Sequence, residues 1–195
     1  MKGFRTAALA LVLLTVVTPA FADWGTGSAV SPTKAPNREG RWDIGVMGGG
    51  AFNSDFDDGA YVQTQVSYGL APWLGLGFEI GYQKNDGDWD GETIEALPIL
   101  IDCLFRFPNL HESIVPYGVF GVGIMSAWVT NDDANDVDST GIVWKVGMGA
   151  DWFVHPDWIA YVEAAYFNGD VKFYDRSSAD EVDFLTLGGG VKYVH

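Results

Sequence analysis

The sequence predicts an all-β protein, an eight-stranded antiparallel up-and-down transmembrane β-barrel, and three observations carry this prediction. From Trp42 to Val194, eight runs alternate apolar residues with small or polar residues. Short and long connectors join these runs in turn, which is typical of barrels with short turns at one rim and long loops at the other. An export signal precedes the runs. Together they predict a place in the outer membrane of a Gram-negative bacterium.

The export signal is predicted over residues 1–22. Lys2 and Arg5 form its basic start, residues 7–17 its apolar core, and residues 20–22 a small-x-small cleavage site. The apolar core is shorter than the roughly 18 residues that a membrane-spanning helix needs. We therefore expect the signal to be cleaved.

Residues 23–40 are rich in Pro, Gly, Ser and Thr and show no periodicity. This composition predicts a flexible leader on the periplasmic side, where the short turns lie. The barrel is predicted over residues 41–195.

The first four predicted strands cover residues 42–52, 60–70, 74–82 and 97–106. In the first three, every second side chain suits lipid and its neighbours are small or polar. The fourth is apolar on both faces, and Pro98 predicts a local bulge there because proline cannot donate to the ladder. The residues predicted to face lipid include Ile44, Val46, Val62, Val66, Leu76, Phe78, Ile80, Ile99, Ile101 and Cys103.

The last four predicted strands repeat the alternation around residues 120–124, 142–152, 158–166 and 185–193. Their lipid-facing positions include Phe120, Val122, Ile124, Ile142, Val146, Met148, Val162, Leu185, Leu187 and Val191. The long loops are predicted over residues 53–59, 84–91, 130–139 and 169–180.

Aromatic residues near both ends of the runs predict two interfacial girdles. The short-turn girdle comprises Trp42, Trp73, Phe107, Trp152, Trp158 and Tyr193, and the long-loop girdle comprises Phe52, Tyr82, Trp128, Trp144 and Tyr166.

The overall charge is strongly acidic. Loss of the signal with Lys2 and Arg5 changes the net charge from −15 to −17, and more than half of the acidic residues lie in or beside the predicted long loops. Such a charge disfavours nucleic acids and other polyanions as partners. Cys103 is the only cysteine, which excludes an intramolecular disulfide and a thiolate metal cluster.

Charged residues also occupy positions that face the barrel interior. An eight-stranded barrel is just wide enough to be filled by side chains, so mixed charges there predict an ion-pair network that plugs the lumen. A narrow, gated ion path is the alternative that stays open. The predicted network comprises Asp43, Glu79, Asp102, Arg106, Lys145, Asp151, Glu163 and Lys192.

One predicted loop resembles part of a calcium-binding loop. Asp86, Asp88 and Asp90 with Gly91 match its first half, but its twelfth position is Leu97 instead of the bidentate glutamate. The sequence therefore predicts weak calcium binding at most, against the alternative of a solvated acidic surface. It predicts no other cofactor.

Three segments resemble the small outer-membrane β-barrel superfamily, which includes the OmpA-like transmembrane domain and the opacity-type porin family. Residues 116–123 resemble its PY-x-G-x-G strand, and residues 97–107 its preceding strand. Residues 190–195 are similar to the terminal signal read by the barrel-insertion machinery, with Gly190, Tyr193 and His195 at its key positions, although that family usually ends in Phe.

The resemblance implies a barrel that is inserted by that machinery and is in contact with outer-membrane lipid and lipopolysaccharide. Residues 41–195 are expected to form the barrel alone, so the wall-anchoring role of the family's two-domain members is not expected here. We predict a monomeric, non-enzymatic protein that supports envelope integrity and presents acidic extracellular loops. A small gated channel or porin for ions or small solutes is the first alternative. A lipid A-modifying barrel enzyme is the second, disfavoured because His111 and His155 lie in short turns and His195 is terminal.

Overall fold

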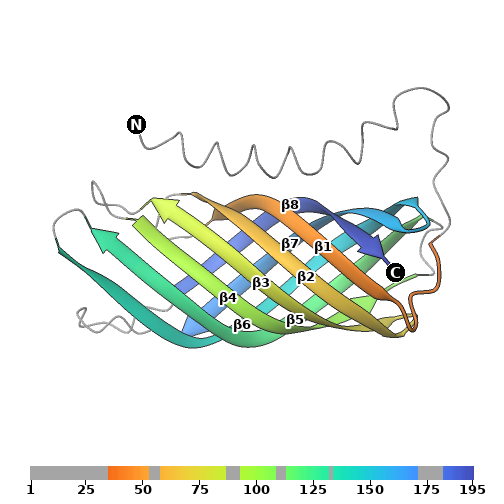
Figure 1. Cartoon of the computed structure of the whole chain (residues 1–195), viewed down its shortest axis with the longest axis horizontal. Coiled ribbons are helices and arrows are strands. Elements are labelled where there is room, and N and C mark those ends of the chain that lie inside the picture. The colour runs from red at the N-terminus through yellow and green to blue at the C-terminus, as the bar shows by residue number, and fades with distance from the viewer. Residues whose placement is uncertain (1–34, 53–57, 87–92, 109–112, 132–133, 171–181) are drawn as a thin grey trace, which may run out of the picture. The chain divides into compact units, whose positions relative to one another are not determined.

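The computed structural model describes residues 35–52, 58–86, 93–108, 113–131, 134–170 and 182–195. These residues form a closed barrel in which each strand pairs antiparallel with its neighbours in sequence, and β1 also pairs with β8 (Figure 1). The predicted eight-stranded, all-β architecture is therefore confirmed. The strands are β1 (Trp42–Phe52), β2 (Gly59–Ala71), β3 (Leu74–Asp86), β4 (Thr93–Arg106), β5 (Ile114–Asn131), β6 (Ala134–His155), β7 (Trp158–Asp170) and β8 (Val182–Val194).

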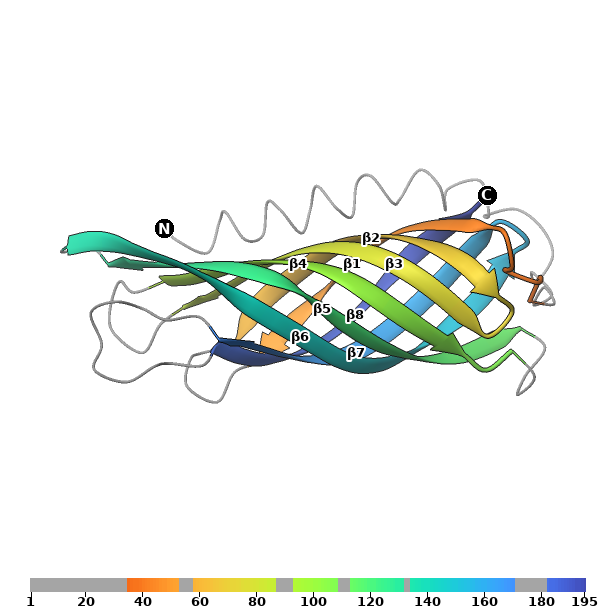
Figure 2. The ribbon, with the colours of Figure 1, turned by 90° about the horizontal axis from the view of Figure 1, so that it is seen from below.

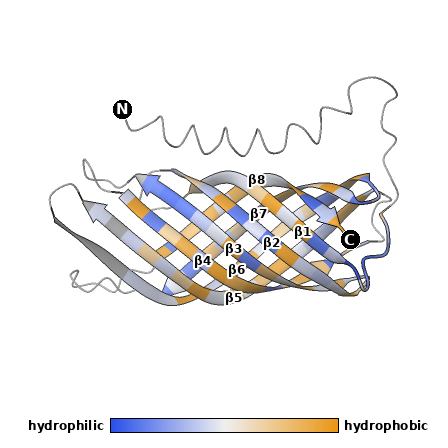
Figure 3. Ribbon diagram, viewed as in Figure 1, coloured by the Kyte–Doolittle hydropathy of each residue, from blue (hydrophilic) through white to orange (hydrophobic). Residues whose placement is uncertain are grey.

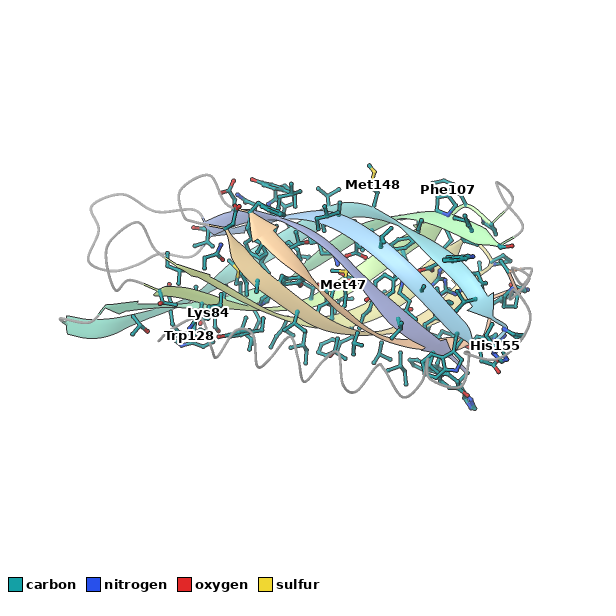
Figure 4. All side chains as sticks on the ribbon, turned by 90° about the horizontal axis from the view of Figure 1, so that it is seen from above. Met47, Lys84, Phe107, Trp128, Met148 and His155 are labelled. Atoms are coloured by element: carbon teal, nitrogen blue, oxygen red, sulfur yellow. The ribbon has the colours of Figure 1, made fainter. Side chains whose placement is uncertain are left out.

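Strand pleating separates two faces with different chemistry. On β6, Lys145 is 0% exposed, whereas its neighbours Trp144 and Val146 are 38% and 47% exposed. Figure 3 shows apolar and polar positions alternating along the strands. In Figure 4, Met47 lies inside the barrel and Met148 projects away from it. The predicted lipid-facing register is therefore the observed one.

Aromatic side chains on the outer face meet in pairs across neighbouring strands. The ring centroids of Trp158 and Tyr193 are 5.3 Å apart near the short-turn end, and those of Trp144 and Tyr166 are 5.6 Å apart toward the other end. Such pairs stabilise a sheet beyond the area that they bury.

The hairpin of β5 and β6 is longer than the sequence predicted. Residues 130–139 were expected to be a loop, but β5 runs to Asn131, β6 begins at Ala134, and Trp128 pairs with Asp138 in the ladder. This hairpin extends past the other strands (Figure 2). The prediction was wrong because it relied on alternating apolar residues, which residues 130–139 lack, whereas the hairpin is held there by its backbone ladder.

The predicted bulge at Pro98 was also wrong. The pairs Ile80–Ile99 and Gln83–Ala96 on either side of it keep one register between β3 and β4, and β5 pairs with Pro98 directly through Met125. The proline removes a hydrogen-bond donor without inserting an extra residue, since the ladder on both sides holds the register.

The predicted signal at residues 1–22 and most of the predicted leader lie outside the described residues. Among the residues that the structure does describe, no helix is long and apolar enough to cross a membrane.

Candidate functional site: the charged barrel interior

The middle of the barrel holds one buried lysine among three buried carboxylates. The Lys145 Nζ atom lies 2.6 Å from Glu79 Oε2, 3.0 Å from Glu163 Oε1 and 3.7 Å from Asp102 Oδ2. All four side chains are 0–1% exposed. We call these four residues the central cluster.

The register explains how these four side chains meet. Asp102 on β4 pairs with Gly121 on β5, and Gly121 pairs in turn with Lys145 on β6. A Cβ atom on Gly121 would lie 2.2 Å from Asp102 Oδ1. Because Gly121 has no side chain, there is space between β4 and β6 for Asp102 and Lys145 to face each other across β5.

Neutral donors complete the central cluster. Tyr61 donates its hydroxyl proton to Glu79 Oε1 at 3.1 Å, and Tyr117 donates to Glu163 Oε2 at 2.8 Å. The Gln65 amide donates to Asp102 Oδ2 at 3.3 Å. Such charge-assisted bonds hold the carboxylates in place.

A second group of charges lies toward the short-turn end. Arg106 Nη2 lies 3.1 Å from Asp43 Oδ2, and Lys192 Nζ lies 2.9 Å from Asp151 Oδ1. Arg38 pairs with both of these aspartates. We call Arg38, Asp43, Arg106, Asp151 and Lys192 the mouth cluster.

Arg38 was missed by the sequence reasoning, which placed it in a flexible leader. Its side chain is 3% exposed and lies over the ring of Phe153 at 5.8 Å. The described part of the predicted leader, residues 35–40, thus places one buried side chain, Arg38, inside the barrel and is held by a turn, and the prediction of flexibility is corrected for it. No periodic pattern in the sequence indicates that Arg38 is buried, because this residue lies before the first strand. It is held in place by the turn and by its own ion pairs.

The turn that carries Arg38 is fastened to the end of β2. The Gly40 amide donates to the carbonyl of Gly69 at 2.8 Å, and the Gly69 amide donates to the carbonyl of Arg41 at 3.0 Å. Gly40 has a φ of 74°, which favours glycine, and a Cβ atom on Gly69 would lie 1.8 Å from the Arg38 carbonyl oxygen. Both glycines are therefore required for this close approach.

Apolar side chains fill the interior on the other side of the central cluster. The rings of Phe167 and Phe184 stack with centroids 4.6 Å apart, and the Tyr61 ring lies 5.7 Å from that of Phe167. Met125 and Val143 are fully buried beside them in the same core cluster. The lumen thus consists of a charged mouth, a charged centre and an apolar layer.

Replacing Arg38 with alanine is expected to lower the free energy of unfolding by roughly 1.5–3 kcal/mol, the range for a hydrogen bond to a charged group. The loss stays moderate because Asp43 keeps Arg106 and Asp151 keeps Lys192. Urea unfolding of the protein in phospholipid vesicles measures it. The control is Arg41→Ala, whose pair with Asp157 is partly exposed at 3.3 Å and should contribute about 1 kcal/mol or less. Equal losses in both variants would contradict a structural role for Arg38.

The predicted calcium loop lies largely outside the described residues. Asp86 ends β3, while Asp88 and Asp90 are not described. Among the residues that are described, no three His, Cys, Asp or Glu side chains gather as metal ligands. Calcium binding therefore stays a prediction.

The predicted insertion signal forms the end of β8. Gly190 lies on the inner face, Tyr193 on the outer face, and the backbone of His195 exchanges two hydrogen bonds with that of Trp42 at 2.8 and 3.1 Å. Its recognition by the insertion machinery stays a prediction.

The fold and the filled, ion-paired interior define a small membrane-spanning β-barrel. A family model described as the outer membrane protein beta-barrel domain matches residues 8–194. The chain belongs to this family and is a protein of the Gram-negative outer membrane, as its resemblance to small outer-membrane barrels predicted. Comparison of the sequence with curated proteins gave no match.

Solved structures with the same fold include three bacterial proteins. Neisserial surface protein A is 16% identical with a TM-score of 0.59, and the match covers 80% of this chain and 97% of that one. The N-terminal β-barrel domain of Pseudomonas aeruginosa OprF is 13% identical, with a TM-score of 0.51 and coverage of 80% and 98%. Ail, the attachment invasion locus protein of Yersinia pestis, is 16% identical, with a TM-score of 0.51 and coverage of 80% and 99%. These identities support the fold alone.

Proposed function

We propose that this protein is a non-enzymatic, monomeric outer-membrane barrel, closed to ions, that supports envelope integrity and presents acidic extracellular loops. The observation that carries the proposal is the interior of the barrel. Two charged clusters and a stacked aromatic layer occupy successive levels of it. An eight-stranded barrel is just wide enough to be filled by side chains, and here ion pairs and hydrogen bonds connect many of the side chains that fill it.

The gated channel is the main competing function. To open a path, the ion pairs of both clusters and the stack of Phe167 on Phe184 would have to part together. Separating these pairs would leave several buried charges without partners at the same time, and each such charge is costly, so the open state has a low equilibrium population. The geometry thus favours the closed barrel.

Recordings in planar lipid bilayers test this proposal. The full-length mature protein is expected to give no unitary conductance steps in potassium chloride, while a general porin in the same membranes serves as the positive control. Reproducible steps from the purified barrel would establish the channel instead. Mass analysis of lipid A from cells with and without the protein tests the enzymatic alternative, and identical spectra are expected.

A cellular measurement tests the envelope role. Cells that lack the protein are expected to become more sensitive to detergent, and the wild-type gene should restore resistance. Unchanged sensitivity in the deletion strain would refute a role in envelope integrity while leaving the closed barrel intact.

A further inference from the structure

The central cluster contains more acid than base. Glu79, Asp102 and Glu163 surround Lys145, which is the only cation in the cluster. The mouth cluster has the opposite excess, with three cations and two carboxylates. Over both clusters, five buried carboxylates face four buried cations in the part of the chain that the structure describes. If every group were ionised, the lumen would carry one uncompensated negative charge.

A buried charge without a partner is costly, and such a group is instead neutralised. A carboxylate achieves this by taking up a proton, and carboxylates that share one site favour it because like charges repel. One proton bound in the lumen would make the two clusters together neutral.

The contacts indicate which carboxylate holds this proton. Glu79 receives bonds from Lys145 and the Tyr61 hydroxyl, and Glu163 is likewise 3.0 Å from Lys145 and bonded by the Tyr117 hydroxyl. Asp102 has the Gln65 amide at 3.3 Å and Lys145 at 3.7 Å, both on Oδ2, and its remaining side-chain contact is with the carboxyl group of Glu79, which is itself an acid. Its Oδ1 is buried without a hydrogen-bond partner; Oε1 of Glu163 also has none, but that atom lies 3.0 Å from the Lys145 ammonium group. Asp102 is therefore the carboxylate least stabilised as an anion.

We propose that Asp102 binds a proton in the folded barrel, so that the lumen is a buried proton-binding site. The titratable and polar groups around Asp102 come from four strands: Gln65 and Tyr61 on β2, Glu79 on β3, Lys145 on β6 and Glu163 on β7. On β5 the residue beside Asp102 is Gly121, and Tyr117 of the same strand contacts Glu163. Arg106 and Lys192 belong to the mouth cluster.

The proposal makes the stability of the barrel depend on pH. An unfolded aspartate loses its proton near pH 3.9, so above about pH 5 the folded barrel binds one proton more than the unfolded chain. Stability then falls as pH rises, and the unfolding equilibrium constant increases tenfold per pH unit for this one proton. Asparagine at this position is neutral at every pH and removes the dependence.

The test measures urea unfolding in phospholipid vesicles between pH 6 and 9. The unfolding equilibrium constant of the wild type is expected to rise with pH more steeply than that of Asp102→Asn, by a factor of up to ten per pH unit. The two proteins should have similar stability at pH 6. Asp183→Asn is the control, because this aspartate is partly buried, accepts a bond from Tyr166 at 2.8 Å and lies outside both clusters; its slope should match the wild type.

Several outcomes would overturn the proposal. Parallel slopes for Asp102→Asn and the wild type would mean that Asp102 is ionised in the folded barrel. Loss of the slope in Glu79→Gln but not in Asp102→Asn would place the proton on Glu79. Stability that follows sodium or potassium concentration instead of pH would mean that a bound cation supplies the charge. If Asp102→Asn fails to fold, the infrared band of a protonated carboxyl group in the wild-type barrel decides, and its absence at pH 7 refutes the proposal.

Discussion

Replacing Lys145 with methionine is expected to lower the free energy of unfolding by about 3–5 kcal/mol, because it removes one partner of a buried network and leaves the rest uncompensated. Methionine keeps an unbranched side chain, so lost packing contributes little. The ammonium group of Lys145 lies within 4 Å of three carboxylates that are 0–1% exposed. Urea unfolding in phospholipid vesicles measures the change, and the heat-dependent shift of the folded barrel on detergent gels checks whether the variant folds.

Lys84→Met is the matched control for this variant. Lys84 pairs with Glu95 at 2.6 Å, which is as short as the pair between Lys145 and Glu79, but its side chain is 41% exposed. Exposed pairs contribute about 0–1 kcal/mol because water and salt screen them. Equal losses in the two variants would show that burial of the central cluster does not govern its contribution.

Replacing Met148 with lysine is expected to destabilise the barrel by roughly 2–4 kcal/mol, the cost of a cation on the lipid face at the middle of the bilayer. Met148 is 71% exposed and lies four residues from each of Trp144 and Trp152, the girdle residues of β6. Lysine has a similar length and adds a charge, so the change tests lipid contact more than packing.

Met148→Leu is the control, with an expected cost below about 1.5 kcal/mol for a volume-conserving change. The same unfolding measurement in phospholipid vesicles applies to both variants. A lysine variant as stable as the leucine variant would place Met148 away from the lipid and would contradict the register of β6.

The alternation of residue types was enough to predict which side chains face inward. With a period of two, a charged residue between lipid-facing neighbours must point into the barrel, as Lys145 does between Trp144 and Val146. This explains why the eight predicted interior charges could be found from the sequence. All eight lie inside the barrel, and each belongs to one of the two clusters.

Alternating residue types indicate a strand only where the strand has one apolar face and one polar face. Residues 130–139, at the end of the β5–β6 hairpin, do not continue the alternation of apolar and polar residue types, so they were predicted to be a loop. Pro98 seemed to require a bulge because sequence alone does not show that the flanking pairs hold the register.

The sequence by itself determined that this protein lies in the outer membrane, how many strands it has and on which face each side chain lies. The reason is that lipid on one side of a strand and a narrow interior on the other require a strict two-residue period. Only the tertiary structure decided which charges meet. Lys145 and Glu79 are 66 residues apart and come together because barrel closure and strand stagger bring β3 opposite β6. Arg38 is five residues from Asp43 but 113 residues from Asp151, and closure of the barrel is what brings the second aspartate beside the first.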